Sequence, residues 1–151
     1  MKQALKYNGL KNHLNTFAKF VFIYEERIKY CNSMQDFNSI SSSALSFFAS
    51  QMQYKMKYAT KEEIRGVNDY TKYSLYFTKS KVQILDFCRH MRNSFSHGIL
   101  KKTGSTLEIT DKTNRGNSKS NQNGPTYTSL GTLDFELVKN FVITIIKDYE
   151  T

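Results

Sequence analysis

Apolar side chains recur every three or four positions through most of the first hundred residues, which is the spacing of amphipathic helices. The first run predicts a helix over residues 14–31, and its apolar positions are Leu14, Phe17, Ala18, Val21, Tyr24 and Ile28. A second helix is expected within residues 36–58, with a late start because the serines around Ser41 disfavour a helix interior. Thr60 and Glu63 have the spacing of a capping box, which predicts a third helix or turn, interrupted near Gly66.

The next apolar positions are aromatic. Tyr70, Tyr73, Tyr76 and Phe77 fit one side of a helix. Such a stripe packs into a core more often than it stacks on bases, so core packing is the expectation.

The pattern of residues 80–96 predicts a helix with Ser80 as its N-cap. This helix carries the residues that are most informative about function. Gly98 follows directly and suits a left-handed C-terminal cap.

After this helix the apolar period changes from helical to two. Residues 106–110 alternate clearly and residues 127–130 more weakly, which predicts a β-hairpin. The connecting residues 111–125 carry no aliphatic or aromatic side chain and are expected to form a mobile loop without core. Thr132 can cap a final helix. The chain is therefore predicted to be one mainly α-helical domain with a small β-hairpin before the C-terminal helix.

Composition and charge narrow the function. The chain has 151 residues, 39% of them hydrophobic, and a formal net charge of +9, which suits a folded domain with a polyanionic partner, nucleic acid or a membrane surface. The charge is concentrated, because residues 72–102 hold seven Lys or Arg and one acid. Cys31 and Cys88 are expected to be buried free thiols. No metal-ligand cluster, cofactor, export signal or membrane span is evident, so a cytoplasmic protein is expected.

Candidate chemistry lies in the sequence Arg92-Asn93-Ser94-Phe95-Ser96-His97. RNA cleavage through the 2′-hydroxyl needs a proton acceptor, a proton donor and positive charge at the phosphate. Histidine can transfer protons near neutral pH, and arginine offers fixed donors that match a phosphate. On a straight helix, side chains five residues apart point about 140° apart. Arg92 and His97 can therefore meet only if the helix end unwinds near Gly98, or if two chains face each other.

This sequence resembles the Arg-x-x-x-x-His motif of the HEPN superfamily, including the polar residue after the arginine. The resemblance implies an antiparallel helical bundle and a homodimer whose two motifs form one metal-independent ribonuclease site. It also implies a toxin-like or antiviral role, with an antitoxin or defence-system partner. Arg92 would bind the scissile phosphate, His97 would be the acid–base residue, and Asn93 would orient the site. Many such toxins carry a modifiable tyrosine two residues after the histidine, where this chain has Ile99.

Other basic residues are candidates for binding RNA: Arg89, Lys101, Lys102, Lys112, Arg115 and Lys119. The last three could clamp RNA or belong only to a disordered loop. His90 is expected to be a surface or boundary residue on the motif helix, without a catalytic role. The alternatives to a ribonuclease are a non-catalytic RNA- or protein-binding module of the same type and, more distantly, a helical protein adaptor.

Overall fold

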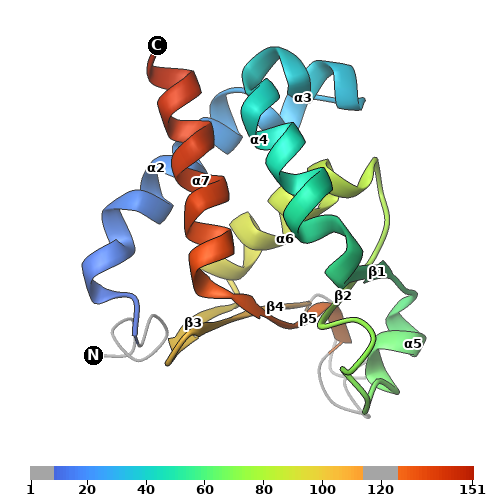
Figure 1. The fold of residues 1–151 in the computed structure, drawn as a ribbon. Helices are drawn as coiled ribbons and strands as arrows, with labels where there is room; N and C mark the ends of the chain where they lie inside the picture. The colour runs from blue at the N-terminus through green and yellow to red at the C-terminus, as the bar shows by residue number, and fades with distance from the viewer. Residues whose placement is uncertain (1–8, 114–125) are drawn as a thin grey trace.

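The computed structural model describes residues 9–113 and 126–151. Five strands form one mixed sheet, and most of the helices stand on one of its faces (Figure 1). In chain order the elements are the short helical turn Lys11–His13, α2 (Leu14–Glu26), the turn Ile28–Tyr30, α3 (Met34–Ile40), α4 (Ser42–Phe47), the turns Phe48–Met52 and Gln53–Lys55, β1 (Met56–Tyr58), α5 (Lys61–Arg65), β2 (Leu75–Phe77), α6 (Gln83–Ser96), β3 (Ile99–Thr103), β4 (Thr106–Thr113), β5 (Thr126–Asp134) and α7 (Phe135–Glu150).

The predicted fold class is wrong. The strand order is β1-β2-β5-β4-β3, with β1 and β2 parallel and the other neighbours antiparallel. This is an α/β fold and not a mainly helical bundle with a small hairpin. The predicted hairpin exists as β4 and β5, but three further strands extend it. Two of these have only three residues each, too few to show an alternating pattern.

The hydrophobic core lies between the sheet and the helices. Phe87 of α6 and Phe48 both pack against Phe141 of α7, with ring centroids 5.6 and 5.8 Å apart. Cys31 and Cys88 are buried free thiols, as expected. Ile64 of α5 is fully buried outside this core cluster. The short helix α5 contacts β5 and lies apart from the other helices, beside β1 and β2 (Figure 1).

Several local predictions are confirmed. The capping box of α5 is present, with Thr60 Oγ1 accepting from Glu63 N and Glu63 Oε1 accepting from Thr60 N. The first helix forms as α2, followed by the separate turn Ile28–Tyr30. The second region is helical, but its expected late start is wrong because α3 already begins at Met34. Ser41 divides this region, and its hydroxyl caps α4 by accepting from Ala44 N.

Other local predictions are wrong. The predicted aromatic helix does not form: Tyr76 and Phe77 lie on β2, Tyr70 and Tyr73 precede this strand, and only Phe77 of the group is buried. Ser80 does not cap α6. This helix begins at Gln83, its N-cap residue is Val82, and no side chain caps it. The N-cap of α7 is Asp134, whereas Thr132 lies within β5.

Strand β4 also continues further than predicted. Asp111 and Lys112 belong to this strand and not to the loop that connects it to β5. Asp111 is buried, although the loop was expected to contribute nothing to the interior. The rest of the predicted loop, residues 114–125, lies outside the described residues.

Candidate active site

The C-terminal end of α6 brings Arg92 and His97 together. The helix ends at Ser96, and the backbone N–H groups of His97 and Gly98 both donate to the carbonyl oxygen of Asn93, over 2.7 and 3.0 Å. The bond from Gly98 spans five residues and widens the last turn, His97 leaves the helical conformation, and its Nε2 lies 3.4 Å from Nη1 of Arg92. The first of the two conditions for convergence is therefore met within one chain. His97 is exposed and Arg92 is half-buried.

Gly98 is required here for a reason other than the predicted one. Its backbone does not adopt a positive φ, so it is not a left-handed cap. A Cβ atom at this position would instead lie 2.1 Å from the carbonyl oxygen of Thr110 in β4. After α6, the backbone of Gly98 lies directly against β4, and the chain enters β3 at Ile99. This close approach fixes where the helix stops, and so where His97 lies.

Besides His97, two side chains contact the guanidinium of Arg92. Nη1 donates to Oδ1 of Asn93 over 3.0 Å, and Nη2 lies 3.5 Å from Oε1 of Glu25 on α2. Its buried Nε has no hydrogen-bond partner among the described residues. Arg92 is therefore anchored from two sides while part of its donor capacity remains unused.

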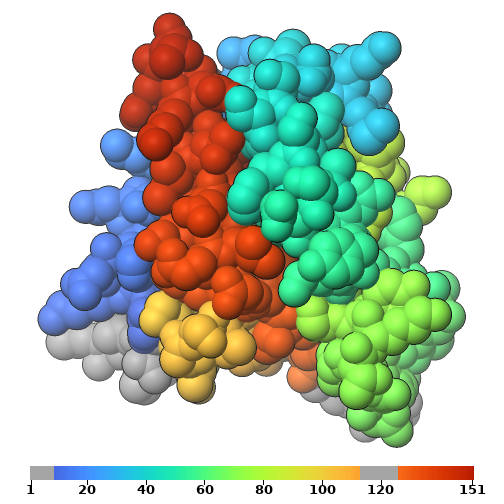
Figure 2. Space-filling model, viewed as in Figure 1, coloured from blue at the N-terminus to red at the C-terminus, as the bar shows by residue number. Residues whose placement is uncertain are grey.

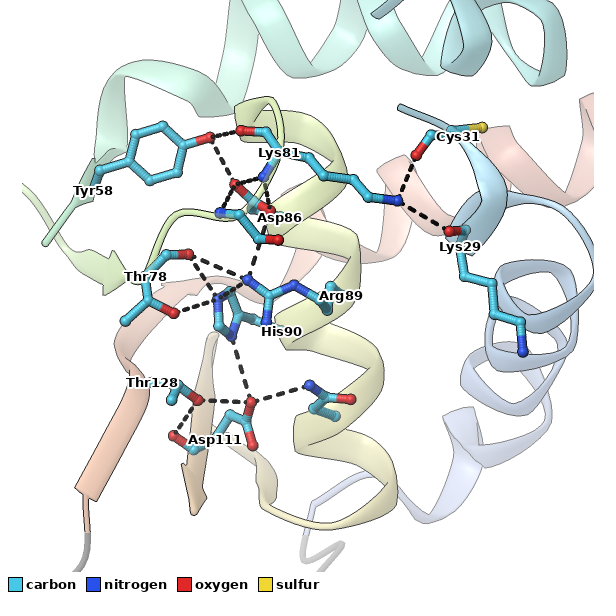
Figure 3. Close-up of polar contacts among 12 residues, drawn as sticks. Lys29, Cys31, Tyr58, Thr78, Lys81, Asp86, Arg89, His90, Asp111 and Thr128 are labelled. Carbon is cyan, nitrogen blue, oxygen red and sulfur yellow. Dashed lines mark hydrogen bonds and ion pairs between the residues drawn. The ribbon is translucent and has the colours of Figure 1, made fainter. Parts of the chain in front are cut away.

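Asn93 is itself held by a buried carboxylate. Its Nδ2 donates to Oδ2 of Asp111 over 3.2 Å. The same oxygen accepts from Thr128 Oγ1 over 2.9 Å and lies 3.4 Å from Nδ1 of His90 (Figure 3). An amide has one donor end and one acceptor end. Because Asp111 accepts from the donor end, the acceptor Oδ1 faces Arg92.

The charge of Asp111 is stabilised by its neighbours. Burial acts to raise the pKa of this carboxyl, but hydrogen bonds from His90, Thr128 and Asn93, together with the charge of His90, leave it below its ordinary value. Asp111 is thus a buried anion directly behind the Arg92–Asn93 pair.

His90 is buried, with 1% of its surface exposed, so the expected surface or boundary position is wrong. Its Nδ1 faces Asp111, and its Nε2 lies 3.0 Å from the carbonyl oxygen of Thr78 and 3.1 Å from Nη2 of Arg89 (Figure 3). The helix places these side chains on the sheet side of α6, away from His97. His90 therefore supports the site from inside and cannot touch a substrate.

Arg89 was predicted to bind RNA, but its guanidinium is engaged within the protein. Nη2 donates to the Thr78 carbonyl oxygen over 3.4 Å and lies 3.6 Å from Oδ1 of buried Asp86. Asp86 also accepts from Ser80 N, Lys81 N and the Tyr58 hydroxyl (Figure 3). Burial and the hydrogen bond to Asp86 raise the pKa of Tyr58. This second cluster fixes the start of α6 against β2.

The other predicted RNA contacts are dispersed. Lys101 and Lys102 lie on β3, where Nζ of Lys102 donates to the Gly104 carbonyl oxygen over 2.8 Å and lies 5.1 Å from the Phe135 ring centroid. Lys112 lies on β4, paired with Tyr127. Arg115 and Lys119 lie outside the described residues.

Glu25 and Asp111 were not singled out from the sequence. Asp111 could have been found, because Leu107, Ile109 and Asp111 continue one alternating series on β4 and so share a face. Glu25 gave no comparable signal, because its contact with Arg92 joins positions 67 residues apart.

In residues 9–113 and 126–151, no three His, Cys, Asp or Glu side chains gather as metal ligands would. Within the same residues, no helix has both the length and the apolar composition needed to cross a bilayer. The chain matches no protein-family model, no curated protein and no solved structure.

Proposed function

We propose that this chain is a metal-independent endoribonuclease that cleaves RNA through its 2′-hydroxyl. The observation that carries the proposal is the meeting of Arg92 and His97 at the end of α6, with 3.4 Å between Nη1 and Nε2. An exposed imidazole beside an anchored guanidinium supplies a proton-transfer group and a phosphate-binding group at one point. The net charge of +9 supports an RNA substrate.

In the proposed reaction, His97 removes the proton from the 2′-hydroxyl, and the 2′-oxygen attacks the phosphorus. The bond from phosphorus to the 5′-oxygen breaks, and a protonated imidazole returns a proton to that leaving oxygen. The products are a 2′,3′-cyclic phosphate and a 5′-hydroxyl. Arg92 stabilises the additional negative charge on the phosphorane, and Asn93 holds its guanidinium in place.

The proposed reaction uses two imidazoles, one as base and one as acid, and the motif of one chain supplies one. His90 is too deeply buried to serve. The proposal therefore includes a twofold homodimer with the residues 92–98 of both copies at one groove. It also includes the cytoplasm as the place of action and a toxin-like or antiviral role, with an antitoxin or defence-system partner.

One observation favours a second candidate, a module that binds RNA without cutting it. Glu25 lies 3.5 Å from Arg92 and competes with a phosphate for the same guanidinium. Glu25→Gln removes this competitor and is expected to tighten RNA binding several-fold, whereas Glu26→Gln, on the next residue of α2, should not. Tighter binding without cleavage in either protein would select the binding module.

The direct test incubates purified protein with a labelled RNA in EDTA. Wild type should produce fragments that end in 2′,3′-cyclic phosphate and should leave the DNA of the same sequence intact. His97→Ala should lose most of the activity, and Arg92→Lys should recover little because lysine lacks the planar fork. Arg27→Lys, at an exposed position after α2, is the matched control. Activity that needs Mg²⁺, or that survives His97→Ala, would refute the mechanism.

A further inference from the structure

A group of three tyrosines lies at the surface, on the corner formed by β1, α5 and β2. The Tyr76 ring contacts Tyr70 and Tyr73 edge to face, with centroids 5.8 and 6.1 Å apart. Tyr70 is 39% exposed, and Tyr73 and Tyr76 are partly exposed. This segment, coloured green to yellow-green, projects from the lower right of the molecule (Figure 2). These rings lie neither on a helix nor in the hydrophobic core, so the core packing expected from the sequence does not explain them.

Cations accompany the rings. Nζ of Lys57 and Nζ of Lys72 each lie 5.5 Å from the centroid of Tyr73. Lys57 is also the register partner of Tyr76 on the β1–β2 ladder. Both lysines are exposed. We name these five residues, Lys57, Tyr70, Lys72, Tyr73 and Tyr76, the tyrosine–lysine surface.

Acids in the part of the chain that the structure describes form no ion pair with the lysines of this surface, although hydrogen bonds with Thr60, and then the charge of Lys57, lower the pKa of Glu63. Residues 53–79 contain six Lys or Arg and three acids, together with five of the chain's ten tyrosines. Glu63 is engaged in the capping box with Thr60, and Asp69 accepts from the backbone N–H and hydroxyl of Thr71. Among the described residues, neither Lys57 nor Lys72 forms an ion pair. The positive charge beside the rings therefore remains available to a partner.

We propose that the tyrosine–lysine surface binds single-stranded RNA, with bases stacked on the tyrosines and phosphates beside the lysines. Proteins that hold single strands without sequence preference combine positive charge along the backbone with aromatic rings on which the bases stack. A duplex hides the faces of its bases and would gain only the phosphate contacts. The surface uses none of the residues of the Arg92–His97 site, and its binding does not require that site to cleave RNA.

The test measures RNA binding by fluorescence anisotropy with the full-length His97→Ala protein, so that no RNA is consumed. The probe is a fluorescein-labelled 12-nucleotide RNA of mixed sequence, either single-stranded or annealed to its complement. Tyr73→Leu should raise the Kd for the single strand by about 5- to 150-fold, as loss of one stacked base predicts. Lys57→Gln with Lys72→Gln should reduce the slope of log K against log salt by about 1.4.

The matched control is Tyr30→Leu. Tyr30 is 68% exposed and has Lys29 Nζ 5.3 Å from its ring centroid, but it lies on the turn after α2. This variant should bind the single strand as the parent does. An unchanged Kd in a folded Tyr73→Leu protein would overturn the proposal, as would equal weakening for single strand and duplex. RNA binding that depends on Tyr73 in a wild-type protein without nuclease activity would refute the proposed function and leave this surface assigned.

Discussion

Nδ2 of Asn93 donates to Oδ2 of Asp111 over 3.2 Å, and this contact connects the exposed Arg92–His97 pair to the buried side of the sheet. The direction of this hydrogen bond determines the orientation of the Asn93 amide. An ionised Asp111 has no proton to donate and can only accept hydrogen bonds. It therefore selects the orientation of the Asn93 amide that presents Oδ1 to Arg92. A site at the surface is thus oriented by a carboxylate behind it.

The first prediction tests this orientation. Asn93→Asp places a second carboxylate against Asp111, and the repulsion between them should lower the free energy of unfolding by about 1–3 kcal/mol. Adding Asp111→Asn restores one donor and one acceptor between the two positions and should recover part of the loss. Urea unfolding of both single variants and the double variant measures the coupling. Strictly additive losses would show that the two side chains do not interact.

The second prediction concerns pH. Hydrogen bonds lower the pKa of Asp111 in the folded protein, so its ionised form contributes stability above the unfolded value of about 4. This contribution is lost as the pH falls through the folded pKa. Asp111→Asn should therefore cost stability near pH 7, and the difference from wild type should shrink below pH of about 4. Thermal unfolding from pH 2 to 7 at one protein concentration measures it. A constant difference over this range would contradict the assigned hydrogen bonds.

Local signals in the sequence predicted the parts of the fold that depend on local interactions. Thr60 and Glu63 lie three residues apart, and their reciprocal hydrogen bonds could be foreseen. The helix that carries the motif and the alternation in β4 and β5 were likewise visible. The short strands β1 and β2 were not, because their pairing joins Met56 to Leu75 and Leu75 to Gly131. Such long-range pairing leaves no periodic trace in three residues.

The same division holds at the site. The sequence identified Arg92, Asn93 and His97 and stated the geometric condition for the first and last to meet. It could not predict why they meet, which is the close approach of β4 to the backbone of Gly98. It also misplaced His90 and Asp111, because their burial depends on how α6 lies across β4. The chemistry inferred from residue type stays a prediction, and packing between distant elements decided which side chains face solvent.

The third prediction tests the packing at the end of α6. Gly98→Ala puts a Cβ 2.1 Å from a backbone oxygen of β4, which cannot move without shifting the strand. We expect a loss of stability of about 1–3 kcal/mol and a displaced His97. Gly66→Ala is the matched control, because the nearest atom there is 3.8 Å away and the backbone φ is −91°. That variant should be neutral or slightly stabilising, by about 0.4–1 kcal/mol. Calorimetry of the two proteins compares them, and equal melting temperatures would contradict the close approach.

The fourth prediction concerns the dimer in the proposed mechanism. Phe22 on α2 is 56% exposed and precedes Glu25, the partner of Arg92, by three residues. Positions three apart share one side of a helix, so a large apolar side chain lies open to solvent beside the motif. A second copy that brings its own His97 to this site would cover Phe22, and burial of one phenylalanine contributes about 1.5–3 kcal/mol.

Phe22→Lys should therefore raise the dimer dissociation constant by at least about tenfold. Specific nuclease activity should fall at low protein concentration and recover at high concentration, because the proposed catalytic residues are unchanged. Tyr54→Lys is the matched control, since Tyr54 is 65% exposed but lies on the turn before β1. Light scattering and RNA cleavage over one dilution series measure both quantities. A monomer with full specific activity would remove the need for a second imidazole, and dissociation caused equally by Tyr54→Lys would place the interface away from His97.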